Sequence, residues 1–529
     1  MANAFTLGGA TIYAPGVLVR STIGANRVLQ LLPFGTIMFA GASDGGVGEG
    51  NVYTFFSYAD AQRVLRGGAL LDAINDAIDG GGASQFIAVV LGTKTSAVLD
   101  LAGASSAAAV VTAGDQGAWT NGIEVAVVAG TTMDTFALIV TYVDALGNTN
   151  VIGGPGTDLD NFTLFSEMAS AIAANAVLTP NDGVTPPIIV LTVTTDGAPV
   201  LHALAPLAGG TGNGAYTPLF ADVQAGLESL VDVAFDIGHL VGVYDLPSQA
   251  YFDEFCASNE PFGRLQRQVA QCVPTGVSPT YTKAVNSAAV RAYGVARAAA
   301  IDSKRTSVMA QRIYKLNKAT GVYGYRDMAP TICGIAAGVG ATGAWGPATP
   351  LTYEILPNTT NVDYPILDQT GDRDAAVRGG LFALERIGAG VSTQARIIQS
   401  VTTFQTTPGG SQNDWAEFSI VRVSDALLAN MKAAAESAAP KAIGGGNDIK
   451  TMNGILADCQ DVLELGIDQR WVTGYDPASV QITIEESDGD LLTYSAAPTR
   501  PLNHLGIDGT MLPYQATVAL SSSSASSGG

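Results

Sequence analysis

The feature that most constrains this chain is an alternation of strand and helix patterns that breaks off near Lys94 and resumes near Leu227. Before the break, residues 36–40 (TIMFA) have the pattern of a short apolar strand, and residues 70–78 place apolar side chains on one helical face. Residues 85–91 (QFIAVVL) then have the pattern of a buried strand. This strand, helix, strand order favours a layered α/β body.

The interrupting segment has a different texture, because it is rich in Ala, Gly and Thr. Short strands are expected there at residues 124–128, 136–143 and 188–193, with one helix near 161–174. We therefore expect a small β-rich domain inserted into the α/β body.

After the insertion the α/β pattern returns. The apolar run 231–237 (VDVAFDI) predicts a strand, and residues 248–257 and 285–303 predict helices. In the last third, Ser424 is expected to cap a helix that runs to residue 438, and Asn447 to cap another that ends at Gly466. Two final strands are expected at 479–485 and 514–520.

The expected fold class is thus a multidomain α/β (α+β) chain, in agreement with a prior of three to four domains from 529 residues at roughly 150 per domain. The boundaries that we expect are an N-terminal extended arm at 1–20, the first part of the body at 21–93, the inserted domain at 94–221, the second part of the body at 222–360, a C-terminal α+β domain at 361–520 and a flexible tail at 521–529.

Composition narrows the functional classes. Only 14% of residues are charged, against a usual figure of about 25%, which suits a subunit whose faces are buried against copies of itself. The net charge of −21 opposes binding to nucleic acid or to anionic membranes. The sequence predicts no signal peptide, because residues 1–13 lack its basic and continuous apolar regions. It predicts no membrane span, because its longest uncharged stretch, residues 329–353, is interrupted by three prolines.

One motif has the form of a catalytic site. Residues 41–45 read G-x-S-x-G after a strand, which is where the nucleophile of a hydrolase would lie, at Ser43. The following glycines predict a loose loop instead of the helix that such a site needs, and only His202, His239 and His504 were candidates for the base. An α/β hydrolase-like enzyme using Ser43 is therefore kept as an alternative only.

Cofactor and metal sites find less support. The glycine loop lacks the Lys-Ser/Thr end of a nucleotide-binding loop, and the histidines are isolated. The four cysteines are interpreted as free thiols: Cys256, Cys272, Cys333 and Cys459. Four aspartates are interpreted as the solvated face of a helix: Asp448, Asp458, Asp461 and Asp468. The tryptophans are interpreted as core or interface anchors: Trp119, Trp345, Trp415 and Trp471. We expect no catalytic residue, cofactor or metal, and a structural protein in place of an enzyme.

Four segments in order resemble the sheath proteins of contractile bacteriophage tails. They are the arm YAPGVLVR at 13–20, the opening LPFGTIMFAGASDGG at 32–46 with the helices and strand that follow, the inserted segments GAWTNGIEVAVV, FALIVTYV, DLDNFTLFSEMASAIAAN and LAGGTGNG, and the helix, helix, strand, strand order of the last third. The resemblance implies a subtilisin-like α/β body, a protruding inserted domain and a tube-facing C-terminal domain.

The resemblance also implies a function. Such subunits form stacked hexameric rings around an inner tube and contract to drive the tube through the target cell envelope. The implied partners are further copies of the chain, the inner tube protein, and baseplate and tail terminator proteins, in a virion tail assembled in the host cytoplasm. A non-contractile capsid or surface-layer protein is a further alternative.

Both chain ends have the apolar alternation of strands that pair with a neighbouring subunit's sheet. The residues predicted to lie in these inter-subunit strands are Tyr13, Val17, Val19, Ala516, Val518 and Leu520.

Overall fold

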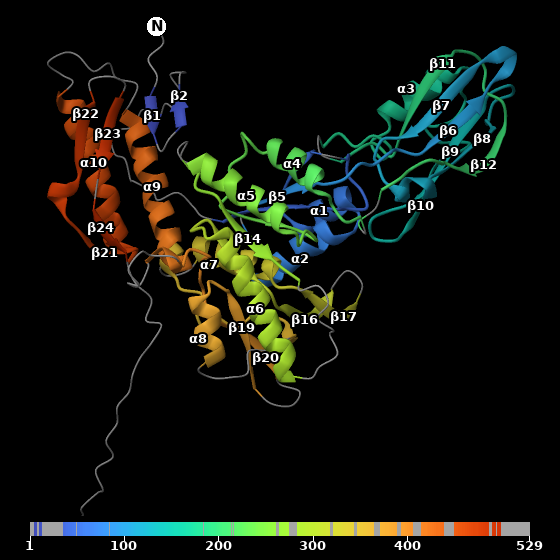
Figure 1. Cartoon of the computed structure of the whole chain (residues 1–529). Helices are drawn as coiled ribbons and strands as arrows, with labels where there is room; N and C mark the ends of the chain where they lie inside the picture. The colour runs from blue at the N-terminus through green and yellow to red at the C-terminus, as the bar shows by residue number, and fades with distance from the viewer. Residues whose placement is uncertain are drawn as a thin grey trace, which may run out of the picture.

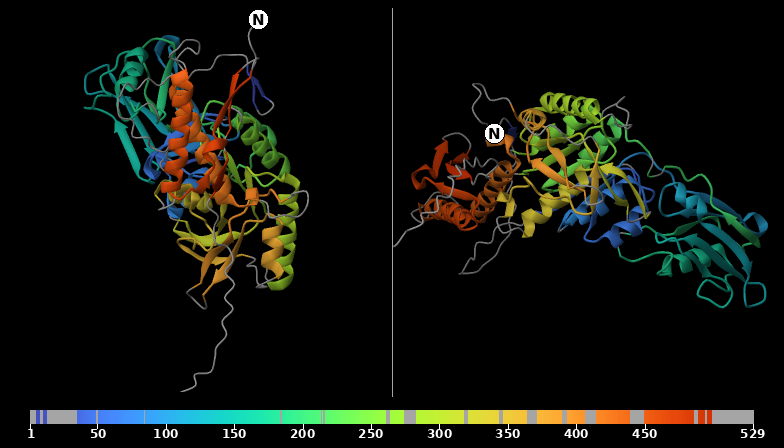
Figure 2. Two further views of the ribbon diagram at one scale, coloured as in Figure 1. Left: turned by 90° about the vertical axis from the view of Figure 1, so that its left-hand side faces the viewer. Right: turned by 90° about the horizontal axis from the view of Figure 1, so that it is seen from below.

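Three bodies lie in a row in the computed structural model of the chain (Figure 1). The inserted domain lies at one end, the α/β body in the middle and the C-terminal domain at the other end, and a perpendicular view shows the same order (Figure 2). The structure describes residues 5–7, 10–12, 35–48, 50–83, 85–182, 185–212, 214, 216–260, 264–273, 283–317, 321–342, 346–363, 371–388, 393–405, 414–438, 449–485, 489–493 and 495–498. The expected multidomain mixture of helices and sheets is confirmed.

The body is built on a six-stranded sheet in the order β15-β14-β13-β3-β5-β4. All neighbouring strands are parallel except β4, which runs antiparallel to β5. The strands are β3 (Thr36–Gly41), β4 (Val52–Phe55), β5 (Gln85–Val90), β13 (Ile237–Leu240), β14 (Arg267–Gln271) and β15 (Thr306–Met309). The strands expected at 36–40 and 85–91 are confirmed, whereas β4 was not anticipated.

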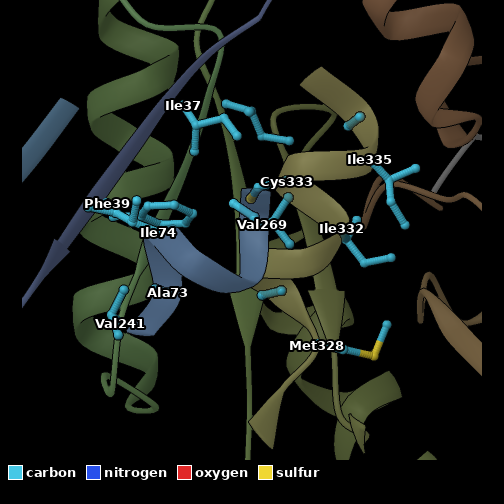
Figure 3. Packing of buried hydrophobic residues seen from close by; sticks show 14 of the residues in the cluster. Ile37, Phe39, Ala73, Ile74, Val241, Val269, Met328, Ile332, Cys333 and Ile335 are labelled. Carbon is cyan, nitrogen blue, oxygen red and sulfur yellow. The ribbon is translucent and has the colours of Figure 1, made fainter. Parts of the chain in front are cut away.

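Helices cover both faces of this sheet, which explains why its strands are continuous apolar runs. The helices are α1 (Tyr58–Leu65), α2 (Ala69–Gly80), α4 (Phe220–Glu228), α5 (Leu246–Asn259), α6 (Lys283–Ile301) and α7 (Ala329–Thr342). Alternate residues of β3 serve the two faces: Ile37 and Phe39 pack toward α2 and α7, and Met38 packs toward α4 and α5. Figure 3 shows the first of these cores, where residues of β3, α2 and α7 converge.

Glycines set the distance between α2 and α7. A Cβ at Gly334 would overlap the carbonyl oxygen of Ala77, and one at Gly80 would overlap that of Thr331. Only glycine allows the two helices to approach this closely. The glycine-rich stretch that begins at residue 329 can therefore form a helix that packs in the core. Among the described residues, no helix is both long enough and apolar enough to cross a membrane.

Further strands and one helix extend the body. They are β16 (Arg312–Asn317), β17 (Val322–Asp327) and β18 (Thr359–Val362), which form one sheet, then α8 (Gly371–Arg378), β19 (Ala383–Ile387) and β20 (Gln394–Gln399). Leu384 of β19 and Ile397 of β20 belong to the same hydrophobic core as Ile37. The packing therefore connects β19 and β20 to the core of the body, and the expected domain boundary at 361 stays a prediction.

The inserted domain is a sandwich of two antiparallel sheets, in the orders β10-β9-β8-β12 and β11-β7-β6. Its elements are β6 (Val98–Ala102), β7 (Ala108–Ala113), β8 (Glu124–Ala129), β9 (Phe136–Val143), β10 (Thr149–Gly153), α3 (Phe165–Ala174), β11 (Ile189–Thr195) and β12 (His202–Pro206). Alternate residues such as Val125, Val127, Leu138 and Val140 fill a separate core. The β-rich character and three expected strands are confirmed.

The C-terminal domain pairs two long helices with two small sheets. Its elements are α9 (Phe418–Ala438), α10 (Ile449–Asp468), β21 (Val472–Tyr475), β22 (Gln481–Glu485), β23 (Gly489–Thr493) and β24 (Ala496–Pro498). Strand β21 pairs only with β24, and β22 only with β23, among the residues that the structure describes. The expected strand at 514–520 and the capping residue Asn447 lie outside those residues.

Two local predictions are wrong. The strand expected at 231–237 begins only at Ile237, because the preceding residues form turns after α4 and Asp236 is engaged by the start of β3. Ser424 does not cap a helix, because α9 begins six residues earlier, at Phe418. Phe418 is buried in the core of the body, so tertiary packing extends the helix beyond its local signal.

We expect Gly334→Ala to lower the free energy of unfolding by about 1–3 kcal/mol, because the added methyl group must push α2 and α7 apart. Urea denaturation followed by circular dichroism measures this change. Gly454→Ala in α10 is the control, since a Cβ there meets no atom within 4 Å, and we expect it to leave stability unchanged or to raise it by up to about 1 kcal/mol. Equal stabilities of the two variants would contradict the proposed role of Gly334.

Candidate functional site

All six residues predicted to lie in inter-subunit strands, which are Tyr13, Val17, Val19, Ala516, Val518 and Leu520, fall outside the described residues. Their pairing therefore stays a prediction. Before the arm the structure contains a small antiparallel hairpin that the sequence did not suggest, formed by β1 (Phe5–Leu7) and β2 (Ala10–Ile12). This hairpin lies near the C-terminal domain in both Figure 1 and Figure 2.

Ser43 is fully buried where β3 ends. Its Oγ donates a hydrogen bond to the carbonyl oxygen of Gly45 at 2.6 Å and accepts one from the Nζ of Lys94 at 2.9 Å. Neither of the described histidines, His202 and His239, takes part, and the sequence did not single out Lys94. The geometry offers no exposed nucleophile at this position.

The glycine loop after Ser43 is firmly held, which corrects the expectation of a loose loop. The amides of Asp44 and Gly45 donate to the carbonyl oxygens of Gly67 and Leu65, at 3.0 and 2.8 Å. The loop resembles neither a catalytic turn nor a phosphate-binding loop, because its glycines lie at the contact between the body and the inserted domain.

Close backbone approach defines that contact. A Cβ at Gly117 of the inserted domain would overlap the carbonyl oxygen of Asp44, and one at Gly214 would overlap the Cα of Gly68. The amide of Gly214 also donates to Asp44 Oδ1 at 2.7 Å, and the amide of Gly48 donates to Gln116 Oε1 at 2.6 Å. The inserted domain is therefore docked on the loops at the carboxyl ends of β3 and β5.

Charged side chains are buried inside this first junction. The Nζ of Lys94 donates to Gly45 O at 2.8 Å, and Asp115 Oδ2 accepts from the indole of Trp119 at 3.0 Å. The guanidinium of Arg66 lies 4.0 Å from the centre of the Trp119 ring. Burial lowers the pKa of Lys94 to about 8, although Asp115 opposes the shift, and burial raises the pKa of Asp115 to about 6.

The raised pKa of Asp115 predicts a pH dependence. Between about pH 4 and pH 6 the folded chain holds a proton that the unfolded chain has released, so this residue makes stability fall as the pH rises through that range. Between pH 4 and pH 6 this effect should lower the free energy of unfolding by roughly 1–3 kcal/mol, and we expect Asp115→Asn to remove that decrease. Urea midpoints measured at both ends of the range test this.

The exposed Asp134 of the same domain supplies the control, because Asp134→Asn should retain the full decrease. An unchanged pH profile in Asp115→Asn would show that Asp115 does not contribute.

A second junction joins the body to α9 at the amino ends of the sheet's strands. Asp425 is buried and pairs with Arg267, at the start of β14, and with Arg305, just before β15. Both Asp425 oxygens accept from Arg305 Nη1 at 2.7 Å. Arg305 also pairs with Glu260 at 3.0 Å, and Glu260 with Lys304 at 2.8 Å. One carboxylate thus holds α9 to two strands of the body.

We expect Asp425→Asn to destabilise the chain by about 3–5 kcal/mol, because two buried guanidinium groups lose their shared anion. Urea unfolding, with limited proteolysis to report release of α9, measures the effect. The control is Asp232→Asn, which removes a pair with Arg264 whose Asp side chain is 94% exposed, and which should change stability by less than about 1 kcal/mol. A loss no larger than that of the control would refute the role of Asp425.

The other residues weighed in the sequence do not gather into a site. His239 is buried with its Nδ1 2.8 Å from the carbonyl oxygen of Val269, His202 lies on edge strand β12, and His504 lies outside the described residues. The four cysteines are free and buried, and burial raises the pKa of each thiol. No group of three potential metal ligands occurs among the residues that the structure describes.

The tryptophans and aspartates have separate surroundings. Trp471 is buried in the C-terminal core, and Trp415 is half-exposed with the ammonium of Lys304 5.0 Å from its ring. Asp461 and Asp468 lie on the exposed face and at the end of α10, whereas Asp448 and Trp345 lie outside the described residues.

Comparisons with known proteins identify the fold. No protein-family model matches the sequence, and no curated protein matches it. A sheath tail protein from Desulfitobacterium hafniense has a similar structure, with a TM-score of 0.61 and 17% sequence identity over 91% of this chain and 97% of that protein. A sheath tail protein from Listeria innocua gives a TM-score of 0.62 and 15% identity over 89% and 94% of the two chains. The chain therefore has the fold of the sheath tail proteins.

Proposed function

We propose that this chain is the subunit of a contractile tail sheath, in which stacked hexameric rings surround an inner tube and contract to drive it through the target cell envelope. The observation that supports this most strongly is that nearly the whole chain, including the inserted and C-terminal domains, shares its fold with two sheath tail proteins. A common body fold alone would say little about function. Here the likeness extends over all three bodies.

The proposed link between subunits is strand donation by the two chain ends. The C-terminal domain supports this proposal, because β21, β22, β23 and β24 form two-stranded sheets whose outer edges have no partner among the described residues. A strand added to such an edge contributes main-chain hydrogen bonds worth about 1 kcal/mol net each. Repeated between many subunits, these bonds would hold rings together while the bodies rotate.

The two junctions suit subunits that move as rigid units. Each outer body is joined to the central body by buried charges and close backbone contacts, so reorientation between subunits is expected at the terminal strands and not within the chain. In this mechanism an extended sheath stores the energy of contraction in a kinetically trapped assembly and needs no nucleotide.

The proposal includes the remaining expectations from the resemblance. The partners are other copies of the chain, the inner tube protein, and baseplate and tail terminator proteins, in a virion tail assembled in the host cytoplasm. The body is subtilisin-like in its layering, and the inserted domain protrudes from it. The net charge of −21 supports the absence of a nucleic-acid partner.

The alternatives have less support. A hydrolase using Ser43 requires access to a side chain that is fully buried and hydrogen-bonded to Gly45. The Ser43→Ala variant should assemble like the parent protein, and a serine-reactive probe should label neither. A capsid or surface-layer protein would not explain the likeness to two sheath tail proteins.

Deleting residues 1–20 should abolish assembly without unfolding the chain, because the donated N-terminal strand is lost. Negative-stain electron microscopy and sedimentation of the concentrated protein should show hollow cylinders or six-fold rings for the full chain only, with equal circular dichroism for both. Deleting residues 521–529, the serine-rich tail, is the control and should leave assembly intact. Cylinders formed by the chain lacking residues 1–20 would overturn strand donation at this end.

A further inference from the structure

A small cavity lies at the second junction, where the amino ends of three body strands meet α7 and α9. Its volume is about 20 Å³, enough for one small ion or water. The residues that line it are Gly35, Asp236, Ile237, Arg267, Ala336, Ala337, Phe418 and Arg422. Apart from one carboxylate and two guanidinium groups, the side chains of this wall are apolar.

Both arginines have unused hydrogen-bonding capacity. Arg267 and Arg422 are only 3% and 4% exposed, and the Nη1 atom of each has no hydrogen-bond partner among the residues that the structure describes. Arg422 donates through Nη2 to the carbonyl oxygen of Ala336 at 2.8 Å, and Arg267 donates through Nη2 to Asp425. A buried guanidinium N–H that lacks an acceptor is costly, so these two atoms point to a missing acceptor.

The residues that line the cavity carry two guanidinium groups and one carboxylate, so the lining itself has a positive excess. Asp425 is shared between Arg267 and Arg305, and the carboxylate that faces Arg422 is Asp236. Asp236 already accepts from the amides of Gly35 and Thr36 through one oxygen, at 2.7 and 2.8 Å. Burial raises the pKa of Asp236, which weakens its ability to neutralise two guanidinium groups.

We propose that this cavity binds one small monovalent anion, chloride in ordinary solution, held by Arg267 and Arg422. A chloride ion accepts hydrogen bonds from any direction and balances the excess charge, which water does not. A cation would meet two guanidinium groups. Because Arg267 belongs to β14 and Arg422 to α9, the bound anion fastens the C-terminal domain to the body.

The inference does not depend on the proposed sheath function, and it is tested on the full chain before assembly. Thermal and urea unfolding are measured in increasing sodium chloride, with sodium gluconate added to keep the ionic strength constant. For a dissociation constant of about 10 mM, about 200 mM chloride should raise the ratio of folded to unfolded chain about 20-fold. Crystals grown in bromide should show one anomalous peak between Arg267 and Arg422.

Three variants give the inference a specific signature. Arg422→Met should lose the chloride dependence, whereas Arg63→Met, at an exposed arginine of α1, should keep it. Asp236→Asn removes the competing carboxylate and should bind chloride more tightly, which provides a gain-of-binding test even if Arg422→Met does not fold. Equal stability in chloride and gluconate, with a water and no bromide at the site, would overturn the proposal.

Discussion

The burial of both faces of the central sheet is the constraint on which the rest of the molecule depends. Because helices cover the two faces, only the two ends of the strands are free to carry further domains. The inserted domain docks at the carboxyl ends, where Lys94 and Gly214 donate to Ser43 and Asp44 of the loop after β3. The C-terminal domain docks at the amino ends, through Arg267 and Arg305. The row of three bodies in Figure 1 follows from this arrangement.

The two junctions both attach an outer body to the central body, but they do so through different interactions. At the carboxyl ends, glycines let two backbones approach so closely that any side chain would intrude, and Lys94 and Asp115 are buried beside them. At the amino ends, bulkier side chains meet, and Asp425 is placed between two arginines. Charged residues are buried in both contacts: Lys94 and Asp115 in the first, and Arg267, Arg305, Arg422 and Asp425 in the second.

Much of the fold was predictable from local patterns. The strands at 36–40, 85–91 and 136–143 are where the apolar runs place them. The errors occur where distant residues decide the outcome. Phe418 extends α9 by packing into the core of the body, and Asp236 ends a predicted strand early by accepting from the amides of Gly35 and Thr36.

The functional contacts were harder to predict, for a related reason. The G-x-S-x-G motif was identified correctly as a loop after a strand, but its partner Lys94 is 51 residues away and belongs to no motif. Asp425 and Arg305 are 120 residues apart. A single sequence carries no signal that pairs such residues, whereas the order of whole segments was enough to indicate the fold that the two sheath tail proteins share.

The two junctions lie at opposite ends of different strands of one sheet, the first after β3 and the second at the start of β14, and this placement has a mechanical consequence. A force that pulls the outer bodies apart acts along β3, β13 and β14, parallel to their length. Such a load strains the hydrogen bonds between neighbouring strands together, in shear, instead of opening them one after another. The central sheet therefore resists a pull along its strands, and it will transmit that pull between the outer bodies while extending little itself.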